Sequence, residues 1–177
     1  MKEQLQLTDI VGYMPYGLEV LGKKHLFKYQ ERPILKVNGL ANNINGEWQC
    51  EYLYDGDLHF TEISDKKYQP LLYPIEYLTK EITVDDETFV PGLKLFELNN
   101  IPGMYEDLHI AETKNEGTNE KGFIVTYLDF EVFGFEYTVS DLKLQPYWII
   151  QKLYEWHIDI GGLIPKSLAL DKTQFEK

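Results

Sequence analysis

The residues in this sequence that could act together chemically are Glu155, His157 and Asp159, at alternate positions in its last long apolar stretch. A histidine between two carboxylates is typical of general acid–base and metal sites. The surrounding periodicity predicts a helix, however, in which side chains two positions apart point in different directions. A helical zinc pair of the HExxH type places two histidines at i and i+4, and that motif is absent here. We therefore expect His157 to lie at the edge of the core.

A second candidate site combines histidines that are far apart in the chain. His59, His109 and His157, with nearby carboxylates, could assemble in space into the site of a small hydrolase-like or metal-dependent enzyme. Cys50 lies in an alternating stretch, which favours a small buried hydrophobe over a nucleophile. The sequence has no nucleophile-elbow, phosphate-loop or dinucleotide motif. It therefore names no cofactor and no metal, and catalysis remains an alternative.

The element predicted to carry His157 is a helix over about residues 146–159. Pro146 suits a first helical position, and Ile149, Leu153 and Trp156 recur at steps of four and three. The pair Gly161-Gly162 is expected to end this helix, because glycine adopts the left-handed conformation of many helix ends.

The rest of the chain predicts an α+β fold, a mostly antiparallel sheet with short helices and a packed C-terminal helix. Asp55-Gly56 and Asp85-Asp86 are turn signals between alternating segments and predict two hairpins. The first resembles a fragment of a calcium loop, but the full ligand spacing does not follow. We expect one globular domain over residues 1–177, with an exposed, mobile loop at about 111–122. Strands are expected at 34–37, 47–54, 57–63, 123–128 and 133–139.

The charge is concentrated in the middle of the chain. Residues 51–145 hold seven lysines and twenty acidic residues, whereas the whole protein has a net charge of −12. Such a surface repels nucleic-acid phosphates, which argues against direct DNA or RNA binding and allows a basic protein partner. Asp85, Asp86 and Glu87 are the candidate partner-binding residues. A solvated acidic surface that keeps the protein in solution is the plainer interpretation.

Composition indicates the compartment. A single cysteine excludes an internal disulfide, the first residues lack the apolar core of a signal peptide, and no stretch is long enough to span a membrane. We expect a cytoplasmic protein. The aromatic residues leave a carbohydrate-binding module as a further alternative, with stacking side chains at Trp48, Tyr52, Tyr54 and Phe60.

Three segments together carry a resemblance: LTDIVGYMPYGL at Leu7–Leu18, PLLYPIEYLTKEI at Pro70–Ile82 and WHIDIGGLIPKSLALD at Trp156–Asp171. The chain resembles a recurrent group of uncharacterised small proteins encoded in phages and prophages of Bacteroidota. It departs from that group at Lys166-Ser167, where a glycine is expected before Leu168. The resemblance implies a phage setting inside a host cell and carries no assigned activity.

These observations favour a non-enzymatic phage or prophage accessory protein that binds a host or phage protein through an acidic surface. The enzyme and the carbohydrate-binding module remain the alternatives.

Overall fold

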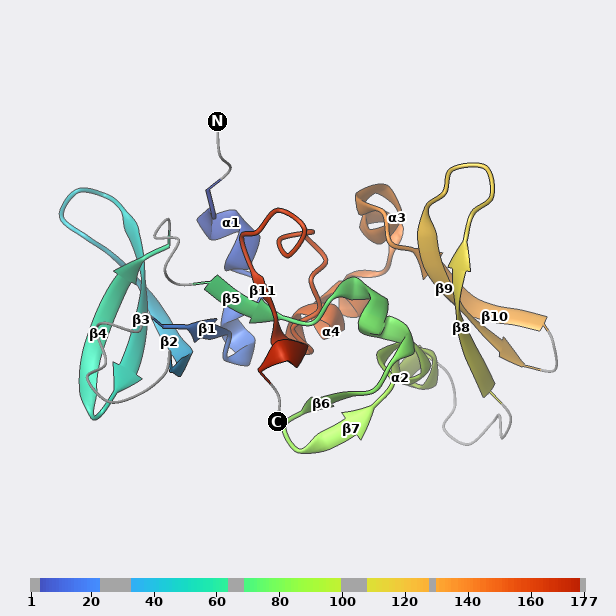
Figure 1. The fold of residues 1–177 in the computed structure, drawn as a ribbon, viewed down its shortest axis with the longest axis horizontal. Helices are drawn as coiled ribbons and strands as arrows, with labels where there is room; N and C mark the ends of the chain where they lie inside the picture. The colour runs from blue at the N-terminus through green and yellow to red at the C-terminus, as the bar shows by residue number, and fades with distance from the viewer. Residues whose placement is uncertain (1–3, 23–32, 64–68, 100–107, 128–129, 176–177) are drawn as a thin grey trace. The chain divides into compact units, whose positions relative to one another are not determined.

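The computed structural model describes residues 4–22, 33–63, 69–99, 108–127 and 130–175 and has an α+β fold, mostly of antiparallel sheets and short helices (Figure 1). The fold class predicted from the sequence is confirmed. The chain divides into two compact units, unit 1 with Met1–Tyr73 and Gly161–Lys177 and unit 2 with Pro74–Ile160. One domain over residues 1–177 stays a prediction.

Unit 1 contains a six-stranded sheet in the order β11-β5-β1-β2-β3-β4 (Figure 1). The sequence forms strands here because apolar side chains alternate along it. Along Ile34–Val37 the side chains are in turn exposed and buried, so one face of the sheet packs on the core. All neighbouring strands are antiparallel except β11 and β5, which are parallel. The strands are β1 (Glu19–Leu21), β2 (Ile34–Asn42), β3 (Trp48–Tyr54), β4 (Asp57–Glu62), β5 (Gln69–Leu72) and β11 (Leu170–Asp171).

Short helical segments complete unit 1: helix α1 (Leu7–Ile10) and the 3₁₀ turns η1 (Met14–Tyr16) and η4 (Lys172–Gln174). Ile10 and Tyr13 are almost fully buried. In η4 the Lys172 ammonium lies 3.0 Å from the Glu19 carboxylate and 5.2 Å from the Tyr73 ring centroid. These contacts join the last residues of the unit to its first strand.

The β3–β4 hairpin turns through only two residues, Asp55 and Gly56, at φ 53° and 85°. Positive φ at both central positions defines a type I′ turn, whose twist matches that of the strands. The predicted hairpin is confirmed. Asp55-Gly56 therefore acts as a turn, and no group of three metal-ligating side chains occurs among the residues described.

Unit 2 contains a three-stranded antiparallel sheet, β10-β9-β8, whose buried face carries Phe123, Val125 and Phe135. Helix α2 lies close to this sheet and to Leu78 because residue 92 is glycine: a Cβ there would lie 2.9 Å from the Phe123 ring and 2.8 Å from the Leu78 carbonyl oxygen. The elements are η3 (Ile75–Thr79), β6 (Ile82–Val84), β7 (Glu87–Phe89), α2 (Pro91–Asn99), β8 (Leu108–Lys114), β9 (Lys121–Tyr127), β10 (Phe130–Glu136), α3 (Val139–Leu144) and α4 (Tyr147–Glu155).

The segment predicted as an exposed, mobile loop at about 111–122 is exposed, but only residues 115–120 form a loop. Its ends belong to β8 and β9, which pair from Leu108↔Tyr127 to Lys114↔Lys121. The turn between them is organised by Asn115, whose Oδ1 accepts hydrogen bonds from the backbone N–H groups of Gly117 and Thr118 at 2.9 and 3.3 Å. The segment lacks large apolar side chains because it is an exposed edge, and backbone pairing to β9 makes it a strand.

The predicted helix over 146–159 ends early, at Glu155. His157 takes a left-handed conformation, φ 54°, and its N–H donates to the Tyr154 carbonyl at 3.0 Å. The Ile158 N–H donates to the Leu153 carbonyl at 2.9 Å, which completes a Schellman motif. Glycine was expected to supply the left-handed residue; histidine supplies it four positions earlier. Leu153 and Ile158, at the two positions where this motif usually has apolar side chains, are both fully buried.

Candidate functional site

The acidic residues singled out in the sequence form the tip of the β6–β7 hairpin in unit 2. The strands pair from Ile82↔Phe89 to Val84↔Glu87, so only Asp85 and Asp86 make the turn. Both have positive φ, 48° and 67°, and both are exposed. This is again a type I′ turn, and the predicted hairpin is confirmed.

The two type I′ turns of this protein differ in their second residue. Gly56 occupies that position in β3–β4 and adopts positive φ without steric strain, whereas Asp86 occupies it in β6–β7. A side chain at a left-handed position costs roughly 1–2 kcal/mol, somewhat less for aspartate than for most residues. The β6–β7 tip thus carries backbone strain that a glycine would remove.

The base of the hairpin is fixed by packing within unit 2. Ile82 is 2% exposed, and the Phe89 ring lies 5.0 Å from that of Trp156, which is also buried. Aromatic pairs at this separation stabilise by about 0.5–1.5 kcal/mol beyond the burial of their area. A firmly packed base with a polar, exposed tip holds the carboxylates of Asp85 and Asp86 in the solvent.

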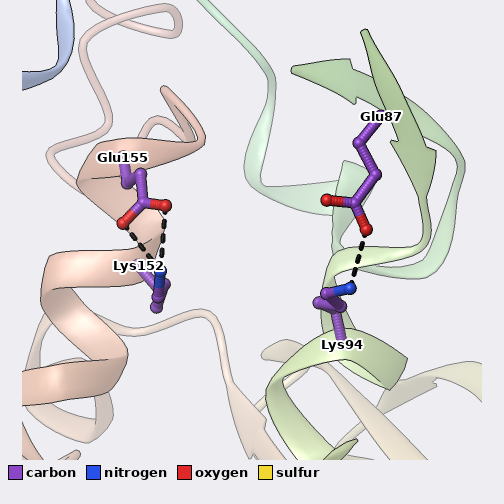
Figure 2. Close-up of polar contacts among 4 residues, drawn as sticks. All are labelled: Glu87, Lys94, Lys152 and Glu155. Carbon is purple, nitrogen blue, oxygen red and sulfur yellow. Dashed lines mark hydrogen bonds and ion pairs between the residues drawn. The ribbon is translucent and has the colours of Figure 1, made fainter. Parts of the chain in front are cut away.

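Glu87 differs from its two neighbours because it has a cationic partner. The Lys94 ammonium on α2 donates to its carboxylate at 2.7 Å (Figure 2). This hydrogen bond is the main cause that raises the pKa of Lys94 above its ordinary value, and burial opposes it. In the part of the chain that is described, neither Asp85 nor Asp86 has an ion pair. The uncompensated charge of the tip therefore belongs to the two aspartates.

Glu155, His157 and Asp159 do not share a helix face, because α4 ends at Glu155. Glu155 accepts hydrogen bonds from Lys152 at 2.8 and 2.9 Å (Figure 2). His157 and Asp159 follow the helix and are 6% and 4% exposed. The helical spacing used to separate them in the sequence was the wrong argument. The backbone of His157 ends α4, which gives this residue a structural role.

The scattered-histidine site gains no support from the geometry. His59 lies on β4, where its ring stacks on Tyr52 at 5.6 Å and 15°. His109 lies on β8 and is exposed. Within the described ranges, no three His, Cys, Asp or Glu side chains are placed to hold a metal ion. His25 lies outside the described residues.

Cys50 is a packing residue rather than a nucleophile. It is 5% exposed, and burial raises the pKa of its thiol from 9.0 to about 11. At neutral pH the thiol is therefore protonated, and the thiolate is the nucleophilic form. The hollow beside it is lined largely by apolar residues, including Leu5, Ile10 and Val20.

Tyr137 is a second buried group with an altered pKa. Its hydroxyl is buried, and no hydrogen-bond partner for it occurs among the residues that the structure describes. Burial, then the charges of Glu112 and Glu76, raise its pKa above the ordinary value. The phenol therefore stays protonated and cannot act as a base at neutral pH.

The four aromatic residues proposed to stack on a sugar do not form one platform. Trp48, Tyr52 and Tyr54 share one face of β3, and Tyr52 is only 2% exposed. Phe60 is paired with Glu51 and therefore projects to the opposite face of the sheet. A carbohydrate site built on these four residues lacks the common open face that it needs.

That opposite face, directed away from the core, holds residues that sequence analysis did not single out. Leu53 and Leu58 face each other across β3 and β4, are 56% and 50% exposed, and lie next to the Glu51↔Phe60 pair. The pairing register brings them together. Their only signal in the sequence is alternation without any lysine or arginine between Trp48 and Glu62.

No protein-family model, no curated protein and no solved structure matches this chain. In the described part of the chain, no helix has the length and apolar character needed to cross a membrane.

Proposed function

We propose that this protein is a non-enzymatic accessory protein of phage or prophage origin that acts in the host cytoplasm. It binds a basic host or phage protein through the tip of the β6–β7 hairpin, with Asp85 and Asp86 as the central contacts and Glu87 at their side.

The observation that carries this proposal is the pair of aspartates in a turn that favours Asn-Gly or Asp-Gly. The same chain uses Asp55-Gly56 for the same turn type, so an unstrained sequence is accessible to this fold. Strain kept at an exposed site is a reason to infer a function for the side chains that cause it. Here the side chains add two adjacent negative charges.

The electrostatics of the tip support a basic partner. Asp85 and Asp86 are exposed and without a cationic partner in the described residues, so they are available to lysine or arginine of another protein. Exposed charges act mainly on the rate of association and on partner choice, and salt screens them. Binding through this tip is therefore expected to weaken steeply with ionic strength.

The test uses a variant that removes the charge and improves the turn. Asp85→Asn combined with Asp86→Gly gives the preferred type I′ sequence, so any loss of binding cannot arise from a damaged hairpin. Asp55→Asn is the matched control, because it removes one carboxylate from the other type I′ turn.

The measurement is a quantitative affinity capture from host lysate at about 0.1 and 0.5 M salt, between which the screening length falls markedly. We expect one basic partner that is captured at low salt, lost at high salt, lost with the double variant and retained with Asp55→Asn. Equal capture by the parent protein and the double variant would show that the hairpin tip is not the binding surface.

A further inference from the structure

The outer face of the β3–β4 hairpin is apolar at one end and acidic at the other. The register lines up three cross-strand pairs on this face: Leu53↔Leu58, Glu51↔Phe60 and Gln49↔Glu62. Leu53, Leu58 and Phe60 are each about half exposed, at 56%, 50% and 47%. Singly exposed apolar residues need no explanation, but three adjacent ones mark a candidate interaction surface.

The strand that carries two of these residues is an edge. β4 is the last strand of the six-stranded sheet, and among the strands that the structure describes it pairs only with β3. An edge strand offers a row of backbone donors and acceptors to a further strand. Extended peptides bind sheets in this way, with backbone hydrogen bonds for affinity and alternate side chains for specificity.

The charge of the β3–β4 hairpin indicates what kind of partner strand is complementary to β4. From Trp48 to Glu62 the hairpin carries four carboxylates, Glu51, Asp55, Asp57 and Glu62, and no lysine or arginine. None of the four has an ion pair within the described part of the chain. A basic segment is complementary to this edge, because opposite charges on neighbouring strands stabilise their pairing.

We propose that the β4 edge binds an extended segment of another protein in which apolar residues alternate with lysine or arginine. Its apolar side chains pack beside Leu58 and Phe60 on the outer face, and its cationic side chains, which project to the other face, reach Asp57. This surface lies in unit 1, and the proposal does not depend on the β6–β7 tip.

The probe is a blocked nine-residue peptide in which lysine and valine alternate, titrated into the full chain and followed by backbone amide NMR shifts. We expect saturable shifts centred on Asp57–Glu62, with affinity at least about tenfold weaker when salt is raised from 0.05 to 0.5 M, because exposed charges are screened. A peptide with proline at its centre is expected to bind at least tenfold more weakly, because proline removes a backbone donor.

The variant pair is Leu58→Thr with Phe60→Thr, which keeps residues that favour strands and removes the exposed apolar groups. Ile34→Thr is the matched control, since Ile34 is an exposed strand residue, 46% exposed, on β2. We expect the double variant to lose at least tenfold in affinity and Ile34→Thr to bind like the parent protein. Circular dichroism melting confirms that each variant is folded.

Three results would overturn the proposal: shifts that avoid β4, equal affinity of the double variant, or equal binding of a glutamate–valine peptide. Peptide binding should also survive Asp85→Asn with Asp86→Gly. This result separates the β4 edge from the hairpin tip, so failure of one proposal leaves the other standing.

Discussion

The Lys94 ammonium and the Glu87 carboxylate are joined by a 2.7 Å hydrogen bond that links the β6–β7 hairpin to helix α2. Both side chains are partly exposed, at 32% and 59%, so water and salt weaken the pair. The contact holds one of the three tip carboxylates against the protein and leaves Asp85 and Asp86 directed to the solvent. It divides the acidic tip into a supported residue and two available ones.

A double-mutant cycle of Glu87→Gln and Lys94→Met should give a small coupling in the free energy of unfolding. We expect about 0.5 kcal/mol at low salt, because exposed ion pairs rarely exceed about 1 kcal/mol. Urea unfolding of the four proteins at a low and a high salt concentration measures this coupling. A coupling above about 2 kcal/mol that resisted salt would contradict a screened surface pair.

The two type I′ turns make a matched pair of stability tests. Asp86→Gly should raise the free energy of unfolding by about 0.5–1 kcal/mol, because relief of left-handed strain exceeds the added chain entropy. Gly56→Asp should lower it by a similar amount, since it introduces the strain that Asp86 now bears. Thermal or urea unfolding measures both. Stability changes of the same sign in the two variants would refute the strain assigned to Asp86.

Gly92→Ala should destabilise unit 2. The added methyl group would lie 2.8 Å from the Leu78 carbonyl oxygen, and backbone cannot move aside as a flexible side chain can. Overpacking of this kind costs about 1–3 kcal/mol. Gly117→Ala is the control, because Gly117 is exposed and its nearest atom, the Asn115 side-chain oxygen, is 3.4 Å from the added carbon. Similar unfolding midpoints for the two variants would contradict the tight contact of α2.

Stability should fall in mild alkali because of Cys50. Its pKa is about 11 in the folded protein against 9.0 for the model thiol, so the folded state keeps the proton longer. This contribution is fully present below pH 9 and is lost as the pH rises toward 11, by about 1 kcal/mol at pH 10. Burial also raises the pKa of Tyr137 and Tyr154, but tyrosine begins to titrate about one unit higher.

Urea unfolding between pH 8 and 10 checks this, with Cys50→Ala as the control. The variant should show a flatter dependence on pH, whatever its absolute stability. An identical pH dependence of stability in the two proteins would mean that the Cys50 thiol does not contribute to it.

Local signals predicted the hairpins well, and they failed where distant partners decide. Asp55-Gly56 and Asp85-Asp86 mark their turns because positive φ is a property of the residues in the turn. The β8 strand was missed because its own side chains are exposed, and only pairing with β9 makes it extended. The end of α4 was missed because the left-handed residue that ends it is His157, whereas glycine is the residue that usually marks such a helix end.

In the candidate site, too, local signals could be read from the sequence and contacts with distant residues could not. The acidic tip could be located from charge and turn residues alone. The partner of Glu87 could not, because Lys94 reaches it from the next element. The Leu53↔Leu58 pair also needs the register of β3 and β4, since in the sequence each is one apolar residue in an alternating strand.

The pairing of β11 with β5 has a consequence for synthesis. All the residues of unit 2, up to Ile160, have been translated before the ribosome reaches the segment that completes unit 1. The sheet of unit 1 stays incomplete until Leu170 is available to pair with β5 and Lys172 to contact Glu19. On a nascent chain, the edge of β5 therefore stays unpaired until after all of unit 2 has been translated. A chain cut before Leu170 would lack β11 and would leave that edge of β5 open permanently.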